Sequence, residues 1–310
     1  MSRPPIEKLP LAARKDSKRS RMLNWLLVRD NWEANRDAIA TKVSGLLGEQ
    51  YTLEVDMNAV YPYADSGYAK DRPGQMTKDY FDGFLYRLEE YLKKYGDDGK
   101  NTFNQVVTTK KITFEVDPTK DFYYCGCDVK EGRFRILAKE GYLATNINDA
   151  CAEILKAIEQ AEAAAGGSGL SVGAKGNVKE TVDKEWPGLE KQFETLIGTK
   201  IVLDANLEAN YAKMKAGSTS FNDAYLGTVT VDYFKGFAAN LESLKFAGDE
   251  MMQEGFQDAC EKKTIRLEVV DQLQHGYYND VIFEDGVCRI QVRLDFLSLS
   301  SFFFFFFFFF

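Results

Sequence analysis

The segment DYFDGFLYRLE at Asp79–Glu89 decides the fold of this chain, because it recurs as DYFKGFAANLE at Asp232–Glu242. The two segments lie 153 residues apart (79 to 232). A separation of 154 (123 to 277) relates Tyr123-Tyr124 to Tyr277-Tyr278. A near-constant separation between matching residues along the chain is the signature of internal duplication. The sequence therefore predicts two tandem copies of one domain.

The repeat sets the expected domain organisation. The expected parts are a basic N-terminal tail or helix (1–29), repeat unit 1 (30–145), a helix with a Gly-rich linker (146–182), repeat unit 2 (183–297) and a Phe-rich tail (298–310). Within the linker, residues 166–180 are expected to be a flexible connector, because glycine and serine favour chain flexibility. Nine consecutive phenylalanines end the chain. We interpret that run as an artefact, because no folded domain requires it.

Matching residues in the two copies indicate the same local structure. Each unit should open with an amphipathic helix that ends at Gly48 or Gly198, since glycine is favoured just after a helix. A strand with alternating polar and apolar residues follows. Thr77 and Thr230 are expected to be the N-caps of the main helix. In unit 1 the apolar positions of that helix form one stripe along Phe81, Phe84, Leu85, Leu88 and Leu92.

Tight turns complete the predicted fold. Glu131-Gly132 and Asp285-Gly286 favour two-residue hairpins, whose central positions need positive φ. The fold class is α+β: each copy is a two-layer domain with the order α-β-α-α-β-β-β and its helices on one face of a mainly antiparallel sheet. Gly83 and Gly236 lie inside the expected main helix, at the same place in both copies. Glycine destabilises a helix interior, so we expect another backbone to pack closely there.

Composition limits the classes of function. The net charge of −8 argues against general nucleic-acid binding, which needs an excess of Lys and Arg, and no sequence-specific nucleic acid is expected as a partner. Residues 1–21 nevertheless contain seven basic and two acidic residues. This segment is interpreted as a solvated tail, with a targeting signal or a contact to an acidic surface as the alternatives. No span of the membrane is expected.

Cysteine and histidine do not form a recognisable reactive motif. The five cysteines are odd in number and scattered, which indicates reduced thiols and an intracellular, cytoplasmic protein. Cys125 and Cys127 are interpreted as buried structural thiols, because unit 2 has Asn279 and Val281 in their places. His275 is the only histidine and is interpreted as a loop residue. We therefore expect no metal site, no cofactor and no catalytic residue in these motifs.

The long connections between the first strand and the main helix are the expected recognition surface. They are longer than most connections, and such loops are often functional. They are also rich in tyrosine and arginine, which are favoured in interfaces. The candidate binding residues are Tyr61, Tyr63, Tyr68, Arg72, Tyr211, Phe221 and Tyr225.

The leading hypothesis is a non-catalytic binding or scaffold protein that binds a protein partner. Its two units would either pack as an intramolecular pseudo-dimer or engage two sites and gain avidity. One alternative is a carrier of a small apolar ligand, held between helix and sheet at Gly83 and Gly236. A second alternative is an enzyme that uses paired carboxylates on the open sheet face, Glu54 with Glu115 and Asp204 with Glu268.

Overall fold

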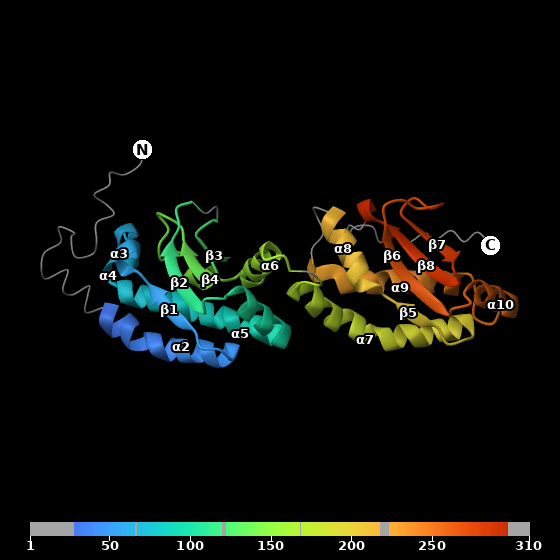
Figure 1. The fold of residues 1–310 in the computed structure, drawn as a ribbon, viewed down its shortest axis with the longest axis horizontal. Helices are drawn as coiled ribbons and strands as arrows, with labels where there is room; N and C mark the ends of the chain where they lie inside the picture. The colour runs from blue at the N-terminus through green and yellow to red at the C-terminus, as the bar shows by residue number, and fades with distance from the viewer. Residues whose placement is uncertain (1–27, 66, 120–121, 168, 218–222, 297–310) are drawn as a thin grey trace, which may run out of the picture. The chain divides into compact units, whose positions relative to one another are not determined.

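The chain forms two compact units, residues 1–168 and 169–310. The computed structural model describes residues 28–296 except 66, 120–121, 168 and 218–222 (Figure 1). The basic segment 1–21, the Phe-rich tail and Phe221 lie outside the described residues. Among the described residues, no helix has both the length and the apolar composition needed to cross a bilayer.

Unit 1 begins with helices, and each strand after the first is reached through a helix or a loop. Its elements are the π-helix η3 (Arg29–Glu33), α2 (Ala34–Leu47), β1 (Thr52–Val55), α3 (Met57–Val60), η4 (Tyr61–Tyr63), α4 (Gly67–Asp71), α5 (Pro73–Val106), β2 (Lys111–Val116), β3 (Cys125–Lys130), β4 (Arg133–Ala138), η5 (Ile147–Asp149) and α6 (Ile154–Ala164).

Unit 2 repeats this order with some differences in helix length. Its elements are α7 (Val172–Ile197), β5 (Val202–Asp204), α8 (Leu207–Gly217), η6 (Asp223–Tyr225), α9 (Leu226–Ser243), α10 (Glu250–Ala259), β6 (Thr264–Val270), β7 (Asn279–Glu284), β8 (Val287–Arg293) and η7 (Leu294–Phe296). Because α7 begins at Val172, most of the segment 166–180 is helical and not the flexible connector that was expected. The Ser171 side chain caps this helix by accepting a hydrogen bond from the Ala174 N–H.

Both sheets are mixed, so the expectation of a mainly antiparallel sheet is wrong. The strand orders are β1-β2-β4-β3 and β5-β6-β8-β7. In each sheet the first two pairings are parallel and only the final hairpin is antiparallel. For the pairing of the first two strands of each sheet the reason is topological, because helices connect those strands and a helical crossover returns the chain in the same direction. The two hairpins were predicted correctly, with positive φ at Glu131, Gly132, Asp285 and Gly286.

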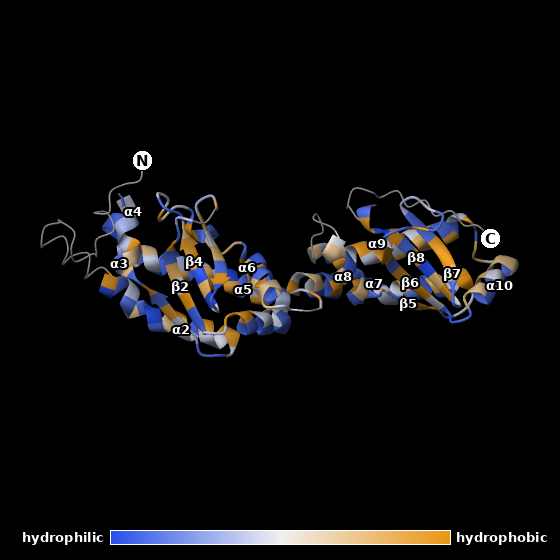
Figure 2. Ribbon diagram, turned by 45° about the horizontal axis from the view of Figure 1, so that its top comes forward, coloured by the Kyte–Doolittle hydropathy of each residue, from blue (hydrophilic) through white to orange (hydrophobic). Residues whose placement is uncertain are grey.

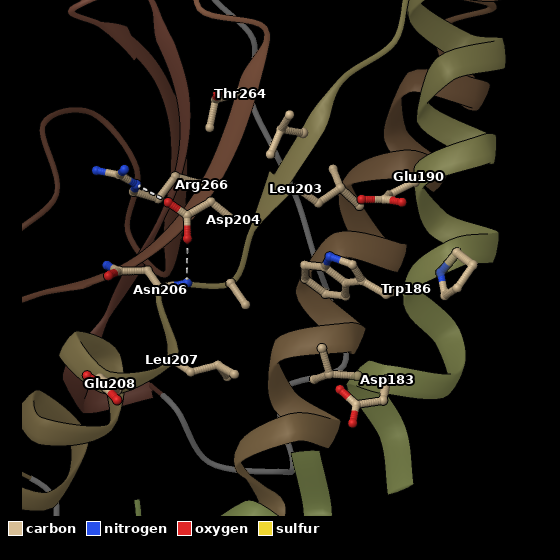
Figure 3. A pocket seen from close by; sticks show the side chains of 14 residues that line it. Asp183, Trp186, Glu190, Leu203, Asp204, Asn206, Leu207, Glu208, Thr264 and Arg266 are labelled. Atoms are coloured by element: carbon tan, nitrogen blue, oxygen red, sulfur yellow. Dashed lines mark hydrogen bonds and ion pairs between the residues drawn. The ribbon is translucent and has the colours of Figure 1, made fainter. Parts of the chain in front are cut away.

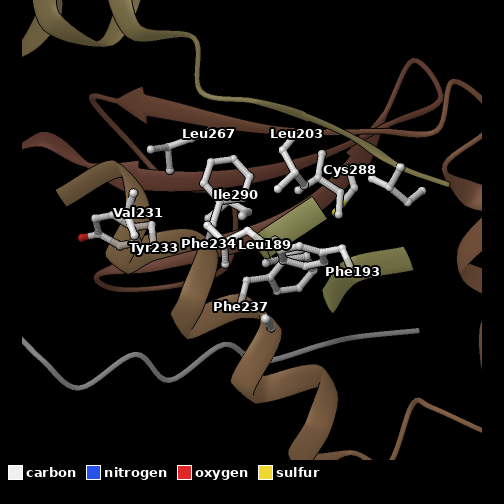
Figure 4. Close-up of a cluster of buried hydrophobic side chains, with 14 of the residues drawn as sticks. Leu189, Phe193, Leu203, Val231, Tyr233, Phe234, Phe237, Leu267, Cys288 and Ile290 are labelled. Atoms are coloured by element: carbon white, nitrogen blue, oxygen red, sulfur yellow. The ribbon is translucent and has the colours of Figure 1, made fainter. Parts of the chain in front are cut away.

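The hydrophobic core of each unit lies between the sheet and its long helices. In unit 1 the Phe84 and Phe103 rings of α5 lie 5.1 Å and 5.4 Å from the Phe134 ring of β4. In unit 2 the rings of Phe193, Phe234 and Phe237 pack beneath β-strand residues such as Ile290 (Figure 4). The central strands are mainly hydrophobic, whereas the helices combine both kinds of residue (Figure 2). Burial of each such ring stabilises the fold by about 1.5–3 kcal/mol.

Helix ends are partly as expected. Gly48 and Gly198 end their helices with φ of 72° and 75°, as predicted. Thr77 and Thr230 are not N-caps, because α5 and α9 begin four residues earlier, at Pro73 and Leu226. Both hydroxyls are buried and donate to the carbonyl oxygen four residues back, at 2.9 Å and 2.8 Å. A buried threonine hydroxyl is thus satisfied inside the helix.

Candidate functional site

The larger of the two clefts described here lies in unit 2, at the end of β5. It has a volume of about 970 Å³ and is open to solvent. Residues from α7, β5, the start of α8 and β6 line it, among them Asp183, Trp186, Glu190, Asp204 and Arg266 (Figure 3). Small-molecule and cofactor sites commonly have volumes of about 300–1,000 Å³.

The position of this cleft follows from the parallel pairing of β5 with β6. Asp204 is the last residue of β5 and lies opposite Arg266 in the register. At this point the chain leaves the sheet through Asn206, whose φ of 47° turns it toward α8. The Asp204 carboxylate accepts hydrogen bonds from Arg266 Nε at 2.7 Å and from the Asn206 N–H at 2.9 Å. Open sheets generally bind ligands at the carboxyl ends of parallel strands.

The lining of the unit 2 cleft is acidic with one aromatic wall. Arg266 is paired with Asp204, whereas no described residue forms an ion pair with Asp183, Glu190 or Glu208. Trp186 is half-buried: its ring meets Phe234 edge to face, at 4.9 Å and 76°, and also borders the cleft. An electron-rich indole beside carboxylates attracts cations.

Unit 1 has a smaller cleft at the end of its own first strand, but no residue of the first helix lines it. Its volume is about 380 Å³, and it lies between the end of β1, α3 and β2. Acidic residues again outnumber basic ones, with Glu54, Asp56 and Glu115 against Arg133. The Asp56 carboxylate accepts the Asn58 N–H at 2.9 Å and so caps α3. Glu54 forms an ion pair with Lys111 at 2.8 Å, which leaves this cleft less acidic than its counterpart.

The carboxylates proposed for acid–base chemistry are held in ion pairs. Glu115 lies 3.1 Å from Arg135, and Glu268 lies 2.6 Å from Arg289. The Arg135 side chain is only 4% exposed and also contacts Asp117 and Asp128. Burial opposes its charge, but hydrogen bonds and the charges of Asp128 and Glu115 raise the Arg135 pKa above its ordinary value. Each arginine therefore acts as the centre of a charge network on the open sheet face.

That face is less solvated than the sequence suggested. Arg135 and Leu137 on β4 are 4% and 1% exposed. The connection between β2 and β3 covers part of it, because the Phe122 ring packs on Gly126, where an added Cβ would lie 3.1 Å from the ring. Burial explains why the arginine needs several carboxylates as partners.

The predicted recognition residues of unit 1 are scattered and do not line the cleft. Tyr61 is 1% exposed and belongs to the core. Tyr63 is half-buried and Arg72 is exposed. Tyr68 is 38% exposed, and its hydroxyl donates to the Asp79 carboxylate. The connection that carries them is largely helical, through α3, η4 and α4.

The described recognition residues of unit 2 also lie outside its cleft. Tyr211 is 6% exposed and accepts a hydrogen bond from Lys215 Nζ at 3.2 Å. Tyr225 is 41% exposed at the start of the main helix. Neither tyrosine lines the cleft, although α8, which carries Tyr211, contributes its first residues to it.

The histidine, cysteine and glycine positions considered in the sequence lie in a loop, in a strand and in a helix, respectively. His275 is in a loop, where its Nδ1 lies 3.4 Å from a carboxylate oxygen of Asp280. Cys125 and Cys127 are half-buried and not fully buried as expected. Among the described residues, no group of histidine, cysteine and acidic side chains could hold a metal ion. A Cβ on Gly83 would lie 3.4 Å from the Ile147 carbonyl oxygen, so the expected close backbone is present in unit 1.

Sequence reasoning missed the aromatic wall and the two arginines. Trp186 is one of three tryptophans, and its placement beside the repeated Phe234 could have been inferred from its place on the first helix. Arg135 and Arg289 are also repeated, 154 residues apart (135 to 289). Comparison with protein-family models, curated proteins and solved structures gave no match to this chain.

Proposed function

We propose that this chain is a tandem-repeat binding protein whose two units bind basic segments of a protein partner through the clefts at the ends of β1 and β5. The observation that carries the proposal is that each unit has an acidic cleft at the carboxyl end of its first strand. Two units in one chain would engage two sites and gain avidity.

The likeness of the two sheets supports this proposal. The two sheets have the same strand order and the same pairing senses. Their registers also correspond, because Leu53 lies opposite Ile112 and Leu203 lies opposite Ile265. In each sheet an arginine of the third strand in the sheet order, β4 or β8, lies beside a glutamate of the adjacent strand, β2 or β6. A shared strand order with a cleft at the end of each first strand favours a binding role for both units.

The chemistry of the lining indicates the kind of ligand. Asp183, Glu190 and Glu208 provide negative charge without a paired cation among the described residues. Trp186 and Leu207 provide apolar surface beside them. A segment with lysine or arginine next to an apolar side chain would satisfy both, through charge complementarity and a cation–π contact.

The alternatives are less well supported. For a carrier, the ligand would have to lie at Gly83 or Gly236, and neither glycine lines either cleft. At Gly83 the Ile147 backbone occupies the space. For a carboxylate enzyme, the candidate acids would need to exchange protons, whereas Glu115 and Glu268 are bound to arginines.

Peptide binding by the full chain tests the proposal. Immobilised peptides that combine lysine or arginine with leucine should bind, and peptides with glutamate in place of the basic residues should not. The double variant Asp183→Lys, Glu190→Lys should weaken binding at least tenfold by calorimetry, and salt should weaken it further. Glu194→Lys is the matched control, because Glu194 is exposed on the same helix but outside the cleft. Equal binding of basic and acidic peptides would refute the proposal.

A further inference from the structure

β5 is an edge strand of the unit 2 sheet. In the part of the chain that the structure describes, it pairs with β6 on one side and with no strand on the other. The Val202 N–H donates to the Lys263 carbonyl oxygen at 2.8 Å, so the backbone groups of Val202 are directed toward β6. Successive residues of a strand direct these groups to opposite sides. Leu203 therefore presents its N–H and its carbonyl oxygen at the outer edge of the sheet.

The outer edge of β5 borders the unit 2 cleft. Leu203 lines this cleft together with residues of α7. Asp183, Trp186 and Glu190 lie on one face of α7, because they are spaced three and four residues apart. Trp186 and Glu190 project from α7 toward β5 (Figure 3). The cleft is thus a groove between an acidic and aromatic helix face and an open strand edge.

The first residue of β5 indicates that this edge is open to a partner. Edge strands usually carry charged residues that prevent pairing with other chains. β5 begins instead with Val202, which lines the cleft and is 55% exposed. The matching residue of β1, 150 positions earlier (202 to 52), is the polar Thr52. Neither Thr52 nor Leu53, which matches Leu203, lines the unit 1 cleft, so the two units differ at this edge.

The dimensions and charge of the cleft suit an extended basic segment. Asp183 and Glu190 are seven residues apart (183 to 190), which is about 10 Å along the helix axis. In an added strand, alternate side chains lie on one side and are about 6.6 Å apart. The flexible stems of lysine or arginine span the remaining distance. Two basic side chains that are two positions apart can therefore reach one carboxylate each.

We propose that the unit 2 cleft binds an extended basic segment of a protein partner as an additional strand beside β5. The Leu203 N–H donates to a carbonyl oxygen of the segment, and the Leu203 carbonyl oxygen accepts an N–H from it. Lysine or arginine side chains two positions apart lie beside Asp183 and Glu190. This binding mode rests on the proposed function and specifies it for unit 2: the strand edge selects an extended backbone, and the carboxylates select basic side chains.

Methylation of the peptide backbone tests this binding mode. The probe is a six-residue peptide with two lysines separated by one leucine, in which each amide nitrogen is methylated in turn. Methylation of the amide that donates to Leu203 should weaken binding to the full chain about tenfold by calorimetry, because one hydrogen bond is lost. Methylation of the amide before or after it should have little effect, because those N–H groups point away from β5. Equal affinities for all the methylated peptides, or equal losses at every position, would overturn the proposal.

Hydrogen exchange of the Leu203 amide tests the position of the peptide. Followed by NMR on the full chain, its exchange should slow about tenfold when the unmethylated peptide saturates the protein, because the N–H gains an acceptor. Leu53 is the matched internal control. The Thr52 N–H donates to the Lys110 carbonyl oxygen at 3.0 Å, so Leu53 also faces outward, but it lies outside the unit 1 cleft and its exchange should not change.

The two experiments distinguish this binding mode from the proposed function. Peptide binding without protection of the Leu203 amide would overturn the added strand and leave the proposed function intact. Absence of any binding by the unmethylated basic peptide would overturn both.

Discussion

Units 1 and 2 each place a tryptophan of the first helix against the first phenylalanine of the repeated segment, but the two indole rings differ in orientation. Trp32 stacks on Phe81 at 4.4 Å and 15°, and it is 3% exposed. Trp186 meets Phe234 at 4.9 Å and 76°, and it borders the larger cleft. The same framework thus uses one tryptophan as core and the other as the wall of a cleft.

The open sheet faces differ in a related way. Arg135 of unit 1 and Arg289 of unit 2 each form ion pairs with three carboxylates, but their side chains are 4% and 17% exposed. Unit 1 therefore depends more on its buried charges, and unit 2 has more surface available to a ligand. Separate measurements on each unit within the full chain can sharpen or refute this contrast.

The largest effect is expected from Arg135→Met. Removal of this cation leaves Asp117, Asp128 and Glu115 without their shared partner, so unit 1 should lose about 3–5 kcal/mol of unfolding free energy. The matched variant Arg289→Met should destabilise unit 2 by less, because Arg289 is more exposed. Hydrogen exchange followed by mass spectrometry reports each unit separately. Equal losses in the two units would contradict the contrast.

Substitution of the two tryptophans should distinguish an effect on the stability of a unit from an effect on peptide binding. Trp32→Ala removes a fully buried ring and should cost unit 1 about 3–5 kcal/mol. Trp186→Ala should cost unit 2 about half of that, because the ring is half-buried, but it should weaken peptide binding about tenfold. Denaturation and calorimetry on the same samples provide both values. Peptide binding that is unchanged in Trp186→Ala would exclude the ring from the site.

A smaller loss is expected from Asn210→Val. The buried Asn210 side chain donates to the Ala205 and Leu267 carbonyl oxygens and accepts the Val269 N–H at 2.8 Å. Unit 1 has Val60 at the matching position. Substitution leaves buried backbone groups without partners and should destabilise unit 2 by about 2 kcal/mol.

The reverse substitution provides the control for this pair. Val60→Asn would place an amide in a site that is 1% exposed, and it should also be destabilising. If Asn210→Val left hydrogen exchange at Val269 unchanged, the side-chain contacts would not be important for the strand.

The smallest effect is an opposite response of the two units to acid. Hydrogen bonds from Thr119, with help from Arg135, lower the pKa of Asp117 in unit 1, so its contribution to stability is lost as the pH falls below about 3.8. Burial raises the pKa of Asp232 in unit 2, so the unit gains stability as the pH falls through that raised value toward 3.8. Hydrogen exchange as a function of pH should show both trends. Asp232→Asn should abolish the gain, and a gain that persists would refute the assignment.

The sequence correctly predicted features that depend on local backbone conformation or on side-chain periodicity. The hairpins at Gly132 and Gly286, the helix ends at Gly48 and Gly198, and the buried stripe of Phe81 and its neighbours were all predicted, because each depends on backbone conformation or side-chain periodicity. Strand direction was predicted wrongly as mainly antiparallel, although helices between the first two strands imply a parallel pair. The helix start was also misplaced, since Thr77 and Thr230 resemble caps by residue type alone.

The sequence by itself determined the recurring segment that begins at Asp79 and Asp232 and the apolar face of each long helix, because propensity and periodicity act within a few residues. Only the tertiary structure decided that Trp186 borders a cleft and that Arg135 gathers three carboxylates. These contacts join residues from different strands and helices. Their geometry depends on how the sheet and the helices pack, and the spacing of residues along the sequence does not specify that packing.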